Sequence, residues 1–193
     1  MGVQSTNLET LAKIDRKTNL EKLFYNVEHI QSFGTTHQHL DLIVGLPYED
    51  IHSFRKSFNT VYQYAPEQLQ IGFLKVLKVS SMHQQSQQFG IVYSEKAPYE
   101  VLFTNWIGFD EILLLKTVED MVEIFYNSGR FRYALSYLVT FFDTPYDFYF
   151  ALGTFYYNTQ LHTKNHSKDA YYTILFDFYH TLCTPTEDTF AWI

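Results

Sequence analysis

The most constraining feature of the sequence is an apolar run that stops at a glycine and restarts after a proline as a helix. It is the stretch HLDLIVGLPYEDIHSF, residues 39–54. A short continuous apolar run is typical of a parallel strand that is covered on both faces. Gly45 permits a close backbone approach at the strand end, and Pro47 ends the hydrogen-bonded ladder. Glu49 and Asp50 favour the positive end of the following helix, and ligands bind at such strand ends.

Strands and helices alternate through the first 80 residues. A strand at 37–44 precedes a helix at 51–61, which ends before Pro66 because the residue before a proline avoids the helical region. A second strand follows at 68–77, with apolar residues on one side. This alternation predicts parallel strands joined by right-handed crossovers.

Two TNLE sequences begin the helices before the first of these strands. They occupy residues 6–9 and 18–21 and have capping-box spacing, so Thr6 and Thr18 are the expected N-caps. The second helix continues with apolar residues at helical spacing and ends near Gly34.

After about residue 80 the pattern becomes helical. A polar helix that ends at Gly90 is expected first, followed by a short extended segment. Four longer helices follow: one at 112–126, one at 131–142, and two that begin at Pro145 and Ser167.

Composition excludes several classes of protein. The net charge of −7 argues against a nucleic-acid partner, which requires a basic surface. No run of about 18 apolar residues exists, so no membrane span is expected. The N-terminus lacks a basic-then-apolar signal, which indicates a cytoplasmic protein. The single cysteine, Cys183, excludes an internal disulfide framework and is expected to be a small buried hydrophobe.

The first 80 residues resemble the second half of a radical S-adenosylmethionine enzyme barrel. GVQSTNLETLAKIDRKTNLE resembles the fourth barrel strand and its helix, LDLIVGLPYED the fifth strand, and QLQIGFLKVLKVSSM the sixth strand. Within this superfamily, the sequence is most similar to enzymes with an N-terminal cobalamin-binding domain. These are the anaerobic magnesium-protoporphyrin IX monomethyl ester cyclase-like Fe–S oxidoreductases. From about residue 85 it resembles the helical domain of unknown function appended to one subgroup.

The resemblance implies an α/β fold with two domains. Residues 1–80 would form the second half of a radical-SAM-type barrel of parallel strands, a half-barrel. Residues 81–193 would form an all-α helical domain. The parent enzyme would cleave S-adenosylmethionine at a [4Fe–4S] cluster to a 5′-deoxyadenosyl radical, with cobalamin as a further cofactor.

The resemblance also implies part of an S-adenosylmethionine site, with no catalytic residue and no metal ligand in this chain. A guanidinium beside the methionine carboxylate has a physical reason in charge pairing. Tyr48 departs from the family pattern, which usually has glycine at that position. The implied contacts are Gln4 and Ser5 at the ribose, Arg16 at the methionine carboxylate, Ile43 and Gly45 near the adenine, and Phe73 and Leu74 beside the adenine through the strand backbone.

The C-x-x-x-C-x-x-C loop that holds the cluster in this superfamily does not occur in the chain. We therefore expect the chain alone to be inactive, to bind no cofactor, and to need the N-terminal half of the enzyme as its partner. A half-barrel also has an open sheet edge near Gln4 and uncovered inner faces around Ile43 and Phe73. Exposed edges and apolar faces favour pairing, so a homo-oligomer through the sheet edge is expected.

Two rival functions remain open. In the first, the helical half is a non-enzymatic interaction module on an α/β scaffold. The missing cysteines favour this function for the chain itself. The strand motifs indicate that its ancestor was an enzyme. In the second, the chain is a hydrolase, which no Ser-His-Asp or metal cluster supports. His37 and His39 share a strand face and His162 and His166 are four residues apart, yet surface histidines explain both pairs.

Two further clusters have structural explanations. Glu119, Asp120 and Glu123 form an acidic helix face, and we expect this face to be exposed to solvent. The Phe and Tyr residues at 141–157 could line a substrate pocket, although such crowding more often forms a core between helices.

Overall fold

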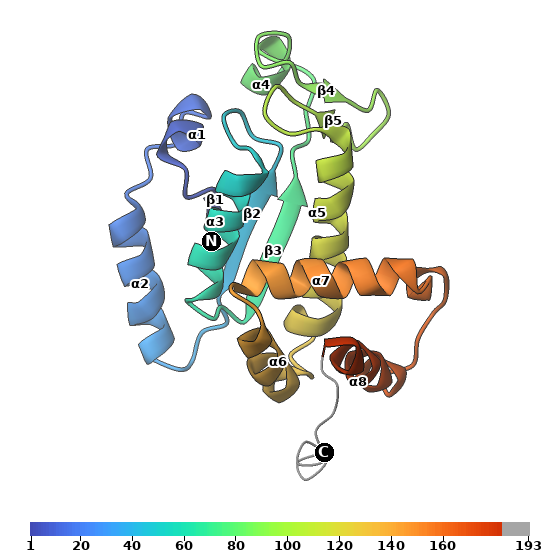
Figure 1. Cartoon of the computed structure of the whole chain (residues 1–193). Coiled ribbons are helices and arrows are strands. Elements are labelled where there is room, and N and C mark those ends of the chain that lie inside the picture. Colours follow the sequence, from blue (N-terminus) through green and yellow to red (C-terminus); the bar gives the residue numbers. More distant parts are fainter. Residues whose placement is uncertain (183–193) are drawn as a thin grey trace.

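A computed structural model of the protein describes residues 1–182. Its centre is a parallel sheet in the order β1-β2-β3, with a small antiparallel pair near one end (Figure 1). The parallel pairing confirms the arrangement predicted from the alternation of strands and helices. The strands are β1 (Gly2–Gln4), β2 (His39–Val44), β3 (Gln68–Phe73), β4 (Val92–Tyr93) and β5 (Val101–Phe103).

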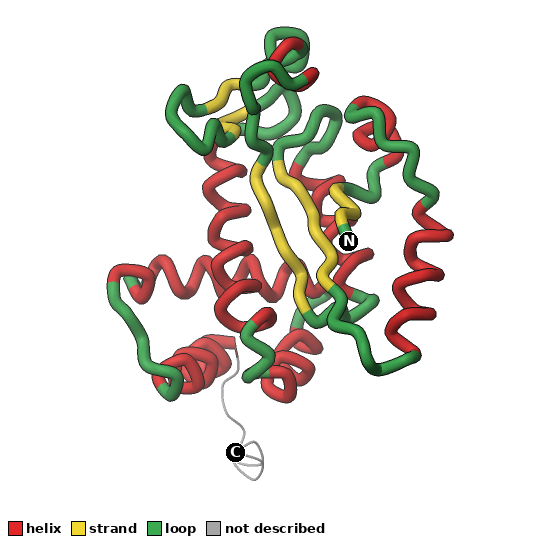
Figure 2. The backbone as a smooth tube through the Cα atoms, turned by 180° about the vertical axis from the view of Figure 1, so that it is seen from behind, coloured by secondary structure: helices red, strands yellow, loops and turns green. Residues whose placement is uncertain are grey.

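Helices surround the sheet on one face and at its sides. In Figure 2, β2 and β3 are seen with α3 behind them and no helix in front. The helices are α1 (Leu8–Lys13), α2 (Leu20–Ser32), α3 (Ile51–Tyr62), α4 (Ser81–Gln84), α5 (Phe109–Met121), η1 (Val122–Asn127), α6 (Arg132–Leu138), η2 (Val139–Phe141), α7 (Pro145–Asn158), η3 (Leu161–Thr163) and α8 (Ala170–Leu182).

The two TNLE sequences do begin helices, but the N-cap of each is the asparagine and not the threonine. Asn7 Oδ1 accepts from the backbone N–H of Glu9 at 3.0 Å, and Asn19 Oδ1 accepts from that of Lys22 at 2.9 Å. Asparagine caps at least as well as threonine. Thr6 has another partner, because its N–H and hydroxyl both contact the Ser57 hydroxyl.

The two faces of the sheet differ in burial. Leu40, Leu42 and Val44 of β2 are fully buried, whereas Asp41 and Ile43 between them are partly exposed. β3 continues the same alternation, with Leu69 and Ile71 buried and Gln70 exposed. The buried side chains pack towards α3, and the partly polar side is the face that is uncovered in Figure 2.

The third strand is shorter than the predicted 68–77. After Leu74, whose N–H still donates to Val44 O, the chain leaves the parallel sheet and pairs with residues 99–101. Val101 N donates to Leu74 O and Val76 N donates to Tyr99 O, both at 2.9 Å. The polar helix predicted before Gly90 is also short, since α4 ends at Gln84 and buries none of its residues. Without an apolar face, nothing holds a longer helix against the protein.

The helix predicted at 112–126 is present as α5 followed by the π-helical turn η1. This wide turn brings the Asn127 side chain to the edge of β3, where its Oδ1 accepts from Leu69 N at 2.9 Å and its Nδ2 donates to Leu69 O at 3.1 Å. Tyr126 donates its hydroxyl proton to Pro66 O at 2.5 Å. The start of β3 is therefore covered by the helical half of the chain.

The predicted helix at 131–142 is α6 with η2, and the predicted starts near Pro145 and Ser167 correspond to α7 and α8. Thr144 caps α7, with Pro145 in its first turn. The aromatic residues at 141–157 mostly form core: Tyr146, Phe148, Tyr149 and Tyr156 are buried among them. Buried apolar residues from both halves of the chain belong to one continuous cluster.

Candidate functional site

The carboxyl ends of the three parallel strands meet at one edge of the sheet. Val44 pairs with Phe73, and Gln4 pairs with Leu42, so Ser5, Gly45 and Leu74 follow their strands at the same edge. We refer to this edge as the rim. The sequence therefore predicted correctly which strand ends lie together.

Ser5 points into the protein at the rim. Its side chain is fully buried, and its hydroxyl donates to Glu49 Oε1 at 2.5 Å and accepts from Asn7 N at 2.9 Å. The preceding residue, Gln4, has a positive φ of 70° and is partly exposed. Of the two residues expected at a ribose, only Gln4 therefore has part of its surface open to solvent.

Glu49 is a functional candidate that the sequence did not identify. The residue is 1% exposed, and its Oε1 accepts from Ser5 and, at 3.2 Å, from Ser57 of α3. Within residues 1–182 its other oxygen, Oε2, has no hydrogen-bond partner. Burial raises the pKa of Glu49 to about 7, against the opposing effect of the two serine hydroxyls. A buried carboxyl that titrates near neutral pH is a common feature of functional sites.

No short sequence pattern predicts the cluster of Glu49 with Ser5 and Ser57. Glu49 follows a strand end, where an acid is expected to favour the next helix, and the N-cap of that helix is in fact Asp50. The hydroxyl partners lie 44 residues before and 8 residues after Glu49 in the sequence. Only the parallel pairing of β1 with β2 brings them together.

Tyr48 adopts the backbone conformation that a glycine would take at its position. Its φ is +63°, and its ring packs on Trp106 at 4.4 Å between centroids and on Phe89 at 6.3 Å. The Lys13 ammonium lies 5.0 Å from the same ring, and Asn7 Nδ2 donates to Tyr48 O at 2.9 Å. Aromatic packing from the second half of the chain thus holds a strained loop of the first half.

Gly45 and Ile43 lie at the end of β2 but in different surroundings. Gly45 has a φ of +85°, and an added Cβ would lie 2.7 Å from Val101 Cγ1, so the glycine permits the close approach of β5. Ile43 lies on the open face opposite Gly72, where an added Cβ would meet only a backbone oxygen at 3.7 Å. Free space therefore lies beside Ile43, not beside Gly45.

Phe73 and Leu74 end the third strand against the helical half. Leu74 N donates to Val44 O and Leu74 O accepts from Val101 N, so both of its backbone polar groups are occupied. Phe73 is partly buried, and the Lys116 ammonium lies 4.1 Å from its ring centroid.

Arg16 lies apart from the rim. Its side chain is exposed, and Nη1 donates to Gly2 O at 2.8 Å, at the start of β1. The residue borders a surface depression between α1 and α2 that Asp15 and Lys17 also line. A Cβ added at Gly2 would collide with Gln4 Nε2 and would lie 3.4 Å from Arg16 Nη2, so these two side chains lie near each other beside the first strand. The other implied contacts follow the strand ends along the rim.

The histidine pairs build no metal site. The His37 and His39 rings are 6.0 Å apart, His162 stacks on Tyr157, and His166 Nε2 contacts Leu161 O at 2.8 Å. Residues 1–182 contain no group of three or more His, Cys, Asp or Glu side chains that could hold a metal ion. Cys183 lies outside the described residues.

The acidic helix face makes structural contacts. Asp120 accepts a hydrogen bond from the Tyr157 hydroxyl, and Glu123 accepts from Asn127 Nδ2 at 2.8 Å. Partial burial, with the neighbouring Asp120 and Glu123 charges, raises the pKa of Glu119. The Asp120 contact ties α5 to α7, and the Glu123 contact lies within η1.

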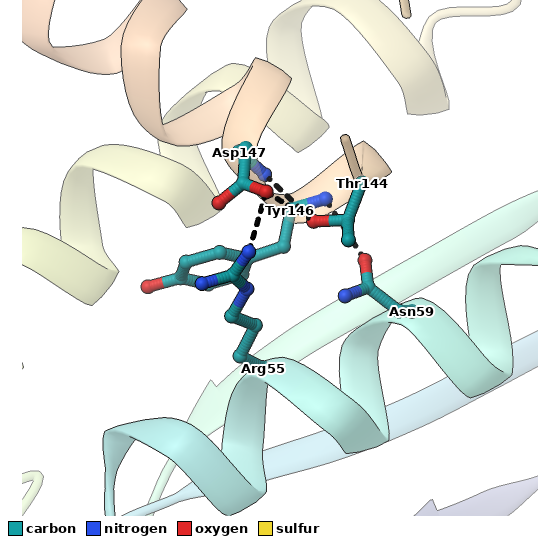
Figure 3. Close-up of polar contacts among 5 residues, drawn as sticks. All are labelled: Arg55, Asn59, Thr144, Tyr146 and Asp147. Atoms are coloured by element: carbon teal, nitrogen blue, oxygen red, sulfur yellow. Dashed lines mark hydrogen bonds and ion pairs between the residues drawn. The ribbon is translucent and has the colours of Figure 1, made fainter. Parts of the chain in front are cut away.

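A polar contact docks the helical half on α3. Arg55 Nη2 donates to Asp147 Oδ2 at 2.6 Å, and Asn59 Oδ1 accepts from Tyr146 N at 2.9 Å (Figure 3). Asp147 also accepts from the Thr144 hydroxyl at 2.7 Å, so the first turn of α7 is capped and anchored together. The rim and the helical half are therefore held in one arrangement.

A family model matches residues 87–191, more than half of the chain. Its description is "Protein of unknown function (DUF4080)". The chain belongs to this family. The matched region begins before β4 and includes Trp106 and Val101, so the DUF4080 region itself closes one side of the rim.

Curated relatives match a further, partial region. The chain is 32% identical over 71 residues to the oxygen-independent coproporphyrinogen III oxidases of Escherichia coli and Salmonella typhimurium, which covers 37% of this chain and 16% of each enzyme. It is 28% identical over 93 residues to the coproporphyrinogen-III oxidase-like protein HemZ of Bacillus subtilis, covering 48% of this chain and 19% of HemZ. The chain thus spans less than a fifth of the length of these relatives.

A solved structure of coproporphyrinogen III oxidase (HemN) from Escherichia coli, described as a radical SAM enzyme, matches 37% of this chain and 17% of its own chain. The identity is 32% and the TM-score is 0.36. By its sequence, the chain is a DUF4080 protein with partial similarity to oxygen-independent coproporphyrinogen III oxidases. In residues 1–182, no helix is long and apolar enough to cross a membrane.

Proposed function

We propose that the chain is the C-terminal part of a radical S-adenosylmethionine oxidoreductase and supplies one side of its cofactor site. The observation that carries the proposal is the gathering of Gln4, Ile43 and Phe73 at the rim of three parallel strands, in a chain with sequence similarity to a radical SAM enzyme. Ligands of α/β proteins bind at this end of the strands.

The residues present fit part of S-adenosylmethionine and none of the cluster. Ile43 offers an apolar contact beside the free space over Gly72, and Gln4 offers a partly exposed amide. A [4Fe–4S] cluster requires three cysteine ligands in this superfamily, and the 193 residues contain one cysteine. When bound, the cofactor pair would supply the radical chemistry; this chain would orient the nucleoside.

In this proposal the uncovered sheet face is the inner face of a barrel. Asp41, Ile43 and Gln70 make that face partly polar, which suits a cofactor-lined interior. Residues 1–80 are the proposed half-barrel, and residues 81–193 are the proposed helical domain that caps one side. The partner of the open face and of the β1 edge is the N-terminal half of the enzyme; in its absence, the β1 edge pairs with a second copy.

The finer assignment is also a proposal. A magnesium-protoporphyrin IX monomethyl ester cyclase-like reaction with cobalamin, in a cytoplasmic enzyme, follows from the resemblance of the strand motifs. The chain alone is inactive in this proposal, because the cluster ligands belong to the other half.

The test is to extend the reading frame upstream and study the longer protein. We expect an in-frame C-x-x-x-C-x-x-C loop and, after anaerobic reconstitution with iron and sulfide, a reduced cluster whose electron paramagnetic resonance signal changes on adding S-adenosylmethionine. Ile43→Lys should abolish the change, whereas His39→Lys, at the other end of the same strand, should leave it intact. An upstream frame without the loop, or a signal that ignores S-adenosylmethionine, would refute the proposal.

An interaction module is the second candidate, and one observation favours it. The helical half exposes a group of aromatic side chains far from the rim. Such a surface has no role in binding a cofactor at the sheet.

A further inference from the structure

Two helices of the DUF4080 region expose rows of aromatic side chains. Tyr133, Tyr137 and Phe141 follow at four-residue spacing along α6 and η2, so they lie on one side of that helix. Tyr172 and Phe176 are also four residues apart and lie on one side of α8. We call this set the aromatic surface; with their exposed fractions, its members are Tyr133 (81%), Tyr137 (53%), Phe141 (44%), Tyr172 (49%), Phe176 (37%) and Leu182 (38%).

The two rows are continuous across the contact between the helices. The rings of Tyr137 and Phe141 lie 6.3 and 5.8 Å from that of Tyr179, which is buried beneath them on α8. Figure 1 shows α6 and α8 at the end of the molecule opposite β4 and β5, and Figure 2 agrees. The aromatic surface is therefore remote from the rim and from the open sheet face.

The aromatic surface is large for an apolar patch on a monomer. Its exposed fractions amount to roughly 600 Å², taking about 200 Å² for each fully exposed side chain. Apolar patches on monomers rarely exceed a few hundred Å². With its polar border, the surface approaches the area of about 800 Å² that each partner buries in a stable dimer.

The charges at the border of the aromatic surface indicate what kind of partner it fits. The two rows contain no formal charge. Two exposed arginines, Arg130 and Arg132, and two exposed aspartates, Asp169 and Asp177, flank them. Tyr172 contacts the backbone oxygens of Arg130 and Asp169. A polyanion or a polycation would meet no excess of the opposite charge here. Two copies related by a twofold axis can instead place Arg132 of each near Asp177 of the other.

We propose that the aromatic surface on α6 and α8 is the contact between two copies of this chain. Tyrosine and phenylalanine suit such a contact, since they bury large areas with few rotatable bonds. The contact is independent of the β1 edge, so a protein with its barrel completed would still use it.

Sedimentation velocity tests the proposal over about 1 to 100 µM, the range in which weak and stable dimers separate. Apart from the wild type, all proteins in this test carry Gln4→Lys, which blocks the proposed β1-edge contact. The protein with this change alone is the reference and should dimerise, and Tyr133→Asp added to it should raise the dissociation constant at least tenfold. That side chain is 81% exposed, so its replacement leaves the core intact. Tyr25→Asp on α2, replacing a residue that is 65% exposed, is the matched control and should dimerise like the reference protein.

Other results would overturn the proposal. A wild type that is monomeric throughout would do so, as would equal weakening by Tyr133→Asp and Tyr25→Asp. If the Gln4→Lys protein were monomeric throughout, the β1 edge would be the only contact between copies. If association appeared only after Trp192→Ser, the end of the chain itself would be the occupant of the aromatic surface.

Discussion

The buried carboxyl group of Glu49 joins the two strand ends that the proposed site depends on. Ser5, at the end of β1, and Ser57, on α3, both donate to its Oε1. The hydroxyl of Ser57 also accepts from Thr6 N at 3.0 Å, so the same cluster fixes the backbone after β1. Two donors offset only part of the desolvation of a carboxylate, and the raised pKa is the consequence.

The stability of the protein should consequently depend on pH through Glu49. Its pKa rises from 4.5 to about 7 on folding. Between these values the unfolded chain has lost the proton and the folded chain retains it, so the free energy of unfolding should fall by about 3 kcal/mol as pH rises. Urea titrations from pH 4 to pH 8 should show the fall in the wild type and a clearly smaller fall in Glu49→Gln. Glu9→Gln, at an exposed position, serves as control; an equal slope in all three proteins would contradict the account.

Tyr48 gives a second prediction at the residue scale. Its positive φ is unfavourable for any residue with a Cβ, by about 1 to 2 kcal/mol, and its ring contacts offset this strain. Tyr48→Ala and Tyr48→Gly both remove the ring, but only glycine also removes the strain. In thermal or urea unfolding, the glycine variant should therefore be the more stable of the two by about 1 kcal/mol. The reverse order would show that the loop relaxes to a negative φ.

The π-helical turn η1 matters because it ends at the edge of the sheet. A regular helix would place Asn127 at a different angle, and π turns often occur where a side chain has a particular task. Here the amide supplies one donor and one acceptor to the backbone of Leu69, as a neighbouring strand would. The helical half thus covers the start of β3. In the described part of the chain no further strand pairs with β1, whose Gly2 O accepts from Arg16 Nη1 instead.

Asn127→Ala should weaken this edge. It leaves the backbone N–H and C=O of Leu69 without their partners, which costs about 1 to 3 kcal/mol when the groups remain shielded from water. Hydrogen exchange of the Leu69 amide should accelerate correspondingly, with little change at Leu40 on the inner strand. Asn158→Ala, an exposed asparagine near the end of α7, is the control. Unchanged exchange at Leu69 would mean that the side-chain contact is dispensable.

Elements with strong local signals were predictable from the sequence. The apolar run before Gly45 and the alternation after it predicted β2 and β3, and Pro145 marked the start of α7. The strand β1 was expected only from the resemblance of its residues to a barrel strand. Weak signals failed where contacts distant in sequence decide the outcome. The shortening of β3 follows from its pairing with residues 99–101, and the role of Glu49 follows from Ser5 and Ser57, none of which a local pattern indicates.

The whole molecule is organised around one core shared by its two halves. α5 and η1 pack beside β3, and α7 lies across α3, where Arg55 and Asp147 form their ion pair (Figure 3). Because that pair is about a third exposed, its own contribution is at most about 1 kcal/mol. Most of the coupling therefore comes from buried apolar contacts such as Phe58 against Tyr149, whose rings are 5.8 Å apart.

A shared core predicts that the halves unfold together. With Trp192→Phe, Trp106 becomes the single tryptophan and reports on the contact between the DUF4080 region and Tyr48. Its fluorescence and the far-ultraviolet circular dichroism of all helices should then follow the same urea transition, with one midpoint and one slope. Arg55→Ala should move both curves together by a small amount. Two separated transitions, with the fluorescence change in one of them, would instead establish residues 1–80 and 81–193 as independent folding units. The rim would then not be held in place by both halves.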